Sequence, residues 1–154
     1  MSDFRSGRAT FFTRGRVARR VSAEPLQVSV DRFEEEFQGG LAAYNAGQFY
    51  DAHEHWETCW RAGITPPKDR DFYKGLIHAT VAYFQISQGN VAAAQKKYRS
   101  AMSFLMKYSP AFHGVDVMRF MDEFAASFEP VLAHGKVPET MLASAPKLRA
   151  PAKR

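Results

Sequence analysis

Residues 76–86 read LIHATVAYFQI, and this segment decides the predicted fold. Placed on a helix of about 3.6 residues per turn, its apolar residues cover nearly every side. A surface helix would keep one polar face, so a helix of this kind must be covered by neighbours on several sides. We therefore expect a central helix at 71–88 inside a helical domain.

Working outward, apolar residues at helical spacing predict four further helices. Asp31 and Glu34 resemble a capping box at the start of the first helix, and Gly47 ends that helix. Pro130 is expected to kink or end the last helix, since proline lacks an amide donor. The apolar stripes of the four helices are Phe33, Phe37, Leu41 and Tyr44; Phe49, Ala52, His53, Trp56 and Trp60; Val91, Ala94, Tyr98, Ala101, Met102 and Leu105; and Val117, Phe120, Met121, Phe124 and Phe128.

The spacing of glycine and alanine indicates how these helices pair. Gly47 and Gly89 each end a helix five residues before a small alanine, Ala52 and Ala94. This pattern is typical of tetratricopeptide-like hairpins, although the two copies lie 42 residues apart and a solenoid needs at least about three repeats of about 34. No segment alternates with a period of two. We predict an all-α fold of about five helices, in an up-and-down bundle of stacked, tetratricopeptide-like helical hairpins.

The net charge of +5 is unevenly distributed and divides the chain into three parts. Residues 1–30 and 136–154 carry +4 each, and the middle of the chain carries −3. We expect a flexible basic arm at 1–30, a helical domain at 31–135 and a flexible basic tail at 136–154, which holds three prolines and too few bulky apolar residues to compensate the cost of ordering. Any binding of nucleic acid would belong to the two ends, because the middle offers phosphates no excess of positive charge.

The arginine-rich arm has three interpretations: a solvated arm, a nucleic-acid contact, or an organelle-targeting segment. No stretch has the length of a membrane span, and no apolar segment follows the N-terminus as in a secretory signal. Cys59 is the single cysteine and has no partner for an internal disulfide. A cytoplasmic protein that makes no membrane contact is the simplest expectation, and the sequence leaves its oligomeric state open.

Residues 51–60, DAHEHWETCW, hold the densest group of chemically active side chains. His53 falls in the apolar stripe, and Glu57 follows one turn later, so the two side chains can meet, whereas Glu54 projects outward. A carboxylate bonded to one imidazole nitrogen would fix the tautomer and leave the other nitrogen for a carbonyl, a ligand or a metal. Trp60 is expected to pack in the core, and Cys59 to lie at the margin of the stripe.

Two functions follow from this cluster. The first is a binding or scaffold module for a protein or peptide partner, with a buried His53–Glu57 network, no cofactor and no complete catalytic group. The second is a metal-binding protein or metal-dependent enzyme centred on His53, Glu54 and Glu57. There a divalent metal would be held by His53, Glu57 and His78, although the spacing does not match the zinc-protease motif H-E-x-x-H.

Four elements between Leu41 and Leu105 resemble the domain of unknown function 309 family. They are YNAGQF at 44–49, the H-E-x-x-E-x-x-W pattern of His53, Glu54, Glu57 and Trp60, GLI at 75–77, and Gly89-Asn90 before an alanine-rich helix. The resemblance implies an all-helical fold and no assigned activity. It also singles out Glu54, which the helical projection places on the outer side.

Overall fold

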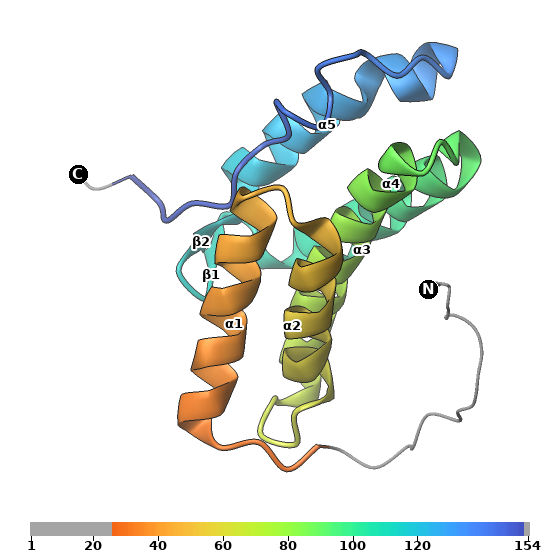
Figure 1. Ribbon diagram of the computed structural model, residues 1–154. Helices are drawn as coiled ribbons and strands as arrows, with labels where there is room; N and C mark the ends of the chain where they lie inside the picture. The colour runs from red at the N-terminus through yellow and green to blue at the C-terminus, as the bar shows by residue number, and fades with distance from the viewer. Residues whose placement is uncertain (1–25, 153–154) are drawn as a thin grey trace.

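The computed structural model describes residues 26–152, and the predicted all-α fold is confirmed (Figure 1). Most of the predicted basic arm lies outside the described residues. The α-helices are α1 (Val30–Asn45), α2 (Phe49–Arg61), α3 (Arg70–Ser87), α4 (Val91–Leu105) and α5 (Val117–His134), and the 3₁₀ turns are η1 (Pro67–Asp69) and η2 (Met106–Tyr108). The short strands β1 (Ala111–Phe112) and β2 (Val115–Asp116) pair antiparallel between η2 and α5.

The first helix begins two residues earlier than the capping-box prediction places it. The hydroxyl oxygen of Ser29 accepts a hydrogen bond from the backbone N–H of Arg32 at 3.1 Å, so Ser29 is the N-cap and Asp31 lies within the first turn. Serine satisfies one of the free amides of the first turn as well as aspartate does. The prediction of Asp31 as the cap was therefore wrong, although the helix itself is confirmed.

Helices α1 and α2 lie side by side because a glycine allows them to approach closely. Trp56 of α2 is fully buried, and its indole N–H donates to the backbone carbonyl of Phe37 at 3.3 Å. A Cβ atom on Gly40 would lie 2.2 Å from Trp56 Nε1, which is well inside van der Waals contact. The indole of Trp56 thus fills the space that the missing side chain of Gly40 leaves.

The central position of α3 is confirmed, because it packs against α2 on one side and α4 on the other. A Cβ atom on Gly75 would lie 2.7 Å from a methyl group of Leu105, so this glycine lets α4 approach. Tyr83 is fully buried further along α3. Within residues 26–152, no helix combines the length and the apolar character that crossing a membrane requires.

Helix α5 packs a stripe of phenylalanines onto the other helices and does not end at Pro130. It continues to His134, where Gly135 adopts a left-handed conformation with φ of 63°. Proline leaves the carbonyl of Ala126 without its usual donor. Ala126 is exposed, so water can satisfy that carbonyl and the helix can continue.

Residues 136–152 differ from the flexible tail that the sequence predicts. They turn back beside α5 and reach the junction of α1 and α2 (Figure 1). Met141, Ala145 and Leu148 are buried against the bundle. Three well-placed apolar side chains thus order a segment whose composition alone indicates disorder.

The contact between Gly40 and Trp56 predicts the effect of replacing this glycine. Alanine gains about 1 kcal/mol in helix propensity, but in Gly40→Ala the new methyl group must displace a buried indole. We expect a net loss of about 1–3 kcal/mol in the free energy of unfolding, measured by urea denaturation. Gly39→Ala is the matched control, because its Cβ would meet only the half-exposed ring of His55. Equal stability of the two variants would refute this account of the helix contact.

Candidate functional site

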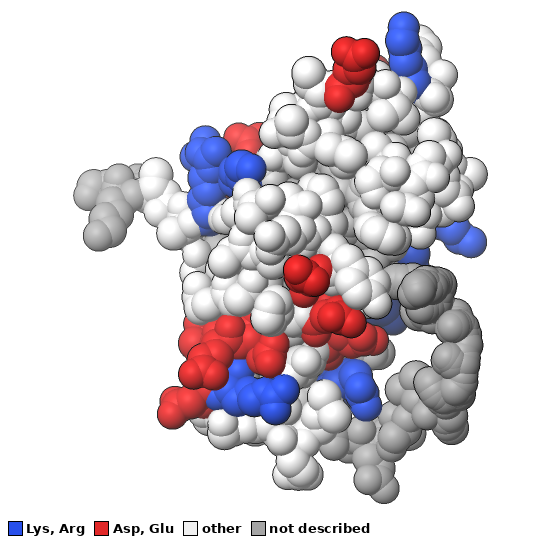
Figure 2. Space-filling model, in the orientation of Figure 1, with Lys and Arg blue, Asp and Glu red and all other residues white. Residues whose placement is uncertain are grey.

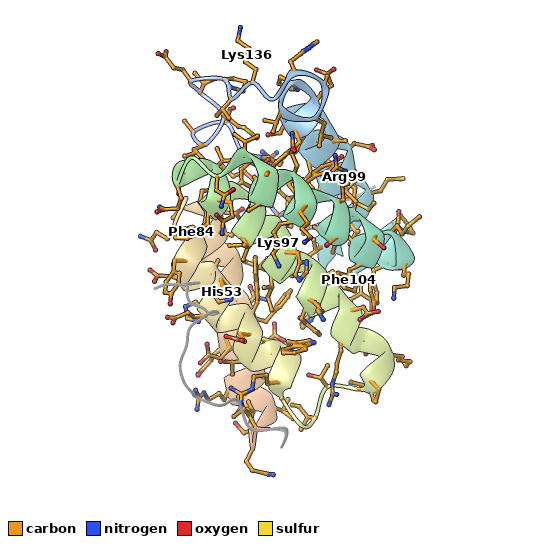
Figure 3. The ribbon with its side chains drawn as sticks, turned by 90° about the vertical axis from the view of Figure 1, so that its right-hand side faces the viewer. His53, Phe84, Lys97, Arg99, Phe104 and Lys136 are labelled. Carbon is orange, nitrogen blue, oxygen red and sulfur yellow. The ribbon has the colours of Figure 1, made fainter. Side chains whose placement is uncertain are left out.

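Five side chains of α2, α3 and α4 form a cluster of basic and aromatic groups on one face of the molecule. The ammonium of Lys74 lies 5.4 Å from the ring centroids of both Trp60 and Phe104. The ring of Phe104 also meets the imidazole of His78 edge to face, with centroids 5.3 Å apart. Lys97 of α4 completes the group, which we call the basic–aromatic cluster: Trp60, Lys74, His78, Lys97 and Phe104. Figure 3 faces this side, with His53 on α2 and Lys97 and Phe104 on α4.

His78 is held in its neutral form. Burial, followed by the positive charges of Lys97 and Lys74, lowers its pKa from an ordinary value of 6.5 to about 3. Its Nδ1 atom is buried and has no hydrogen-bond partner among the described residues. A buried polar atom without a partner costs about 1–3 kcal/mol. A ligand that reached this nitrogen would remove that cost.

The two lysines of the cluster have no compensating acid. Burial lowers the pKa of Lys97, and the nearby charges of Lys74 and Lys96 add to this effect. Within residues 26–152, no ion pair joins Lys74 or Lys97 to a carboxylate. Lys74 is stabilised by the faces of two aromatic rings instead. The cluster therefore concentrates positive charge on a partly desolvated part of the surface.

The residues predicted from the 51–60 segment lie beside this cluster, but not as a His53–Glu57 pair. Among the described residues no hydrogen bond joins these two side chains, and His53 is only half-buried. Burial raises the pKa of Glu57, and the charge of Glu54 adds to this, opposed by Arg61. Glu54 is exposed, as the helical projection predicts. Trp60 is half-buried, packs against the edge of the core and lies over the ammonium of Lys74.

The buried face of α2 is rotated from the predicted one. The fully enclosed side chains near its C-terminal end are Trp56 and Cys59, so the prediction of Cys59 at the margin of the stripe was wrong. Burial raises the pKa of the Cys59 thiol to about 12, and the carboxylates of Glu36 and Glu34 add to the shift. A buried thiol that stays protonated is a poor nucleophile. Cys59 is a core residue.

A metal site at His53, Glu57 and His78 finds no support in the arrangement of side chains. His53 lies close enough to His78 for their charges to interact. In the part of the chain that the structure describes, however, no group of three or more histidine, cysteine, aspartate or glutamate side chains could hold a metal ion. Zinc sites generally need at least three protein ligands.

A second polar place is a groove of about 610 Å³ between α1 and α2. In it, one carboxylate oxygen of Glu36 lies 2.7 Å from Nδ1 of His55, and the other accepts from Arg32 at 3.3 Å. Asp51 and Glu54 also line this groove. Figure 2 shows acidic side chains gathered over α1 and α2 on this side. Each acidic group is largely solvated or paired here, so the groove is a weaker candidate than the basic–aromatic cluster.

A third polar group, which the sequence analysis missed, joins the β-hairpin to the helices. His113 Nδ1 lies 2.8 Å from the hydroxyl of Tyr73, and His113 Nε2 lies 3.0 Å from a carboxylate oxygen of Glu34. Because a carboxylate must accept, Nε2 carries the proton and Nδ1 accepts from the buried tyrosine. The imidazole also stacks on Phe37 with centroids 3.8 Å apart. Every polar atom in this chain of hydrogen bonds has a partner, which indicates that the group stabilises the attachment of the β-hairpin to the helices.

Comparisons with known proteins agree with the resemblance found in the sequence. The model of a family described as a domain of unknown function, DUF309, matches residues 37–96, so the resemblance is confirmed. An uncharacterized protein of Aquifex aeolicus (strain VF5) is 30% identical over 91 residues, which make up 58% of this chain and 26% of that protein. This chain therefore spans about a quarter of that relative's length. No solved structure matches the chain.

The matched region covers only part of the candidate site. Trp60, Lys74 and His78 lie within residues 37–96, whereas Lys97 and Phe104 follow it. Helix α5 and the C-terminal segment also lie outside the match. The comparisons thus support the family resemblance and assign no activity to any residue.

The buried His78 predicts how stability depends on pH. Since its folded pKa lies below the ordinary value of 6.5, the unfolded chain binds a proton that the folded chain excludes. The stability that depends on neutral His78 is complete above about pH 6.5 and is lost as the pH falls toward 3. We expect the free energy of unfolding of the parent, relative to His78→Gln, to fall by on the order of 1 kcal/mol per pH unit between pH 6 and 4.

Urea denaturation of both proteins at each pH measures this difference in the free energy of unfolding. The contribution of the carboxylates cancels, because they titrate alike in the parent and in His78→Gln. His134→Gln, which removes an exposed histidine at the end of α5, is the matched control and should leave the slope unchanged. A parent and a His78→Gln variant with parallel pH profiles would show that His78 is not buried as a neutral group.

Proposed function

We propose that this protein is a binding module and that its basic–aromatic cluster binds an anionic group, a carboxylate or a phosphate, of a small ligand. One observation carries the proposal: Lys74 and Lys97 share a partly desolvated face with the neutral His78, and among residues 26–152 no carboxylate forms an ion pair with either lysine. Unpaired charge away from water is costly, and an anion would compensate it.

The chemistry of the three groups matches such a ligand. Each lysine ammonium has three donors and no acceptor, and charge-assisted hydrogen bonds to anions are about twice as strong as neutral ones. The Nδ1 atom of neutral His78 adds a further polar contact, as donor or acceptor according to its tautomer. The rings of Trp60 and Phe104 provide an apolar border beside Lys74.

Binding has more support than catalysis at this face. Cys59 is enclosed and protonated, and the basic–aromatic cluster holds no serine, threonine or cysteine next to a general base. The metal-dependent alternative centred on His53, Glu54 and Glu57 lacks a third ligand among the described residues. A binding role needs only the charges and rings that the face already presents.

Neighbouring lysines of α4 provide a direct test of the proposal. Lys97 belongs to the cluster, whereas Lys96 is exposed on the outer side of the same helix. Inorganic phosphate, added at constant ionic strength, should raise the melting temperature of the parent through mass action. In Lys97→Met the affinity for phosphate should fall by about tenfold or more, because one charge-assisted hydrogen bond is lost.

Lys96→Met is the matched control and should keep the parent's affinity within about twofold, since long-range charge effects are screened by salt. Acetate, titrated in the same way, distinguishes a carboxylate preference from a phosphate preference. Equal losses in Lys96→Met and Lys97→Met, or no response of the parent to either anion, would refute the proposed site.

A further inference from the structure

The C-terminal segment is held to the bundle in the way that grooves hold extended peptides. Four hydrogen bonds reach the backbone of residues 146–149 (PKLR). Asn45 donates from its side-chain amide to the carbonyl of Leu148 at 2.9 Å and accepts from the N–H of Leu148 at 2.8 Å. The hydroxyl of Tyr44 donates to the carbonyl of Pro146 at 2.7 Å. The backbone N–H of Asp116 donates to the backbone carbonyl of Arg149 at 2.7 Å.

Side chains along this stretch alternate between buried and exposed positions. Pro146 and Leu148 are buried, with Leu148 only 5% exposed, whereas Lys147 and Arg149 face solvent. Lys147 also donates to the backbone carbonyl of Asn45 at 2.9 Å. Backbone hydrogen bonds combined with pockets for alternate side chains are how exposed edges recognise peptides. We call the surface of Tyr44, Asn45 and Asp116 the docking groove.

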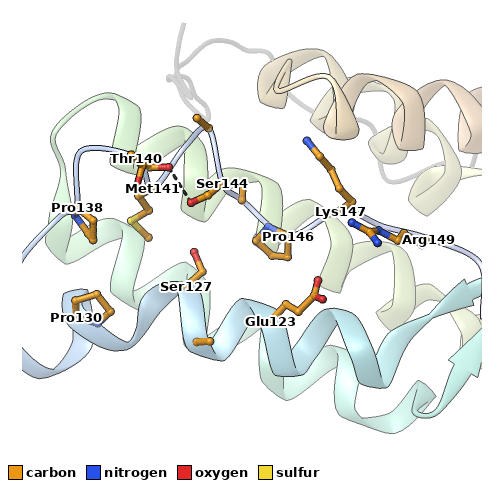
Figure 4. A pocket seen from close by; sticks show the side chains of 13 residues that line it. Glu123, Ser127, Pro130, Pro138, Thr140, Met141, Ser144, Pro146, Lys147 and Arg149 are labelled. Atoms are coloured by element: carbon orange, nitrogen blue, oxygen red, sulfur yellow. Dashed lines mark hydrogen bonds between the residues drawn. The ribbon is translucent and has the colours of Figure 1, made fainter.

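Part of the same segment is separated from α5. A cleft of about 640 Å³ separates them, lined by Glu123 and Ser127 on the helix side and by residues such as Pro138 and Met141 on the other (Figure 4). Ser127 accepts from the hydroxyl of Tyr83 at 2.7 Å, so its own proton is available toward the cleft. Because the docking groove holds one end of this segment and a cleft separates part of it from α5, the segment can detach without unfolding α5 once the buried side chains of Met141, Ala145 and Leu148 are released.

The connection to α5 permits such a movement. Residues 135–137 are exposed, and Gly135 already ends the helix. Detachment would break the hydrogen bonds of the docking groove and expose Met141, Ala145 and Leu148, but it would leave the aromatic stripe of α5 in place. The segment is therefore held by three buried side chains and by the hydrogen bonds of the docking groove.

We propose that the docking groove is a peptide-binding site that the chain's own residues 146–149 occupy, and that an extended basic peptide with a Pro-x-Leu core from another protein displaces them. The proline and the leucine fill the two buried positions, and the basic residues remain in solvent. This inference concerns the junction of α1, β2 and α5 and is independent of the basic–aromatic cluster.

The test uses the full chain with a weakened internal occupant. Leu148→Ala removes the buried side chain, so the groove opens more often and a labelled peptide copying residues 143–151 (ASAPKLRAP) should bind. Fluorescence anisotropy should give an affinity about tenfold or more above that of the parent, in which the internal segment competes. A second change, Asn45→Ala, should remove this gain because both hydrogen bonds to Leu148 are lost.

Two controls separate recognition from loss of stability. Leu132→Ala removes the same side chain from a partly buried position of α5 and should leave peptide binding at the parent's level. A peptide with proline and leucine exchanged should bind neither variant. If folded Leu148→Ala fails to bind the peptide, or if it binds both peptides equally, the proposal is wrong.

Hydrogen exchange of the parent gives an answer even if Leu148→Ala does not fold. The amide of Leu148 should exchange through local opening, faster than core amides of α5 such as that of Phe124. Exchange of both amides only at the rate of global unfolding would show that the segment is part of the core and would overturn the proposal. A dimer formed by exchange of this segment between two copies, detected by light scattering, would overturn the assignment to a separate partner.

Discussion

The ring of Tyr83 is the point at which the parts of this molecule meet. It contacts Tyr44 of α1 and Phe49 of α2, with ring centroids 6.5 and 5.6 Å apart. On its other side it contacts Phe124 and Phe128 of α5, at 5.6 and 5.3 Å. Since α5 lies outside the region that matches the family, this tyrosine joins the matched helices to the remainder of the chain. Its hydroxyl is satisfied by Ser127, so the ring can be fully buried without a polar cost.

The helices could be predicted closely where local signals agree with tertiary packing. Helix α4 begins and ends where the sequence places it, because Asn90 caps it and Gly89 separates it from α3. The continuation of α5 past Pro130 could not be predicted, since it depends on whether the carbonyl that proline leaves free faces solvent. The ordered C-terminal segment was missed for a related reason. Its apolar residues follow no helical period, and its order comes from partners about 100 positions away, such as Asn45.

The candidate site was less predictable than the fold. A projection of α2 alone orders its side chains around an axis, but it cannot say which side the neighbouring helices cover. His53 and Trp60 were therefore assigned to the buried stripe, whereas the neighbours enclose Cys59 instead. The basic–aromatic cluster depends on how three helices cross, and no spacing within one segment reports that. The density of ligating residues in 51–60 placed the candidate site on α2, whereas four of the five residues of the basic–aromatic cluster lie on α3 and α4.

Recognition of residues 146–149 through their backbone affects how this part of the chain can change during evolution. The exposed positions, Lys147 and Arg149, can drift toward other polar residues at little cost to the docked conformation. Leu148 is restricted in two ways, since its side chain is enclosed and its N–H bonds to Asn45. Proline at that position would be excluded, because it has no amide proton to donate. Homologous chains that keep this arrangement should therefore conserve apolar residues at positions 146 and 148 and a polar residue at the end of α1, while the exposed positions between them vary.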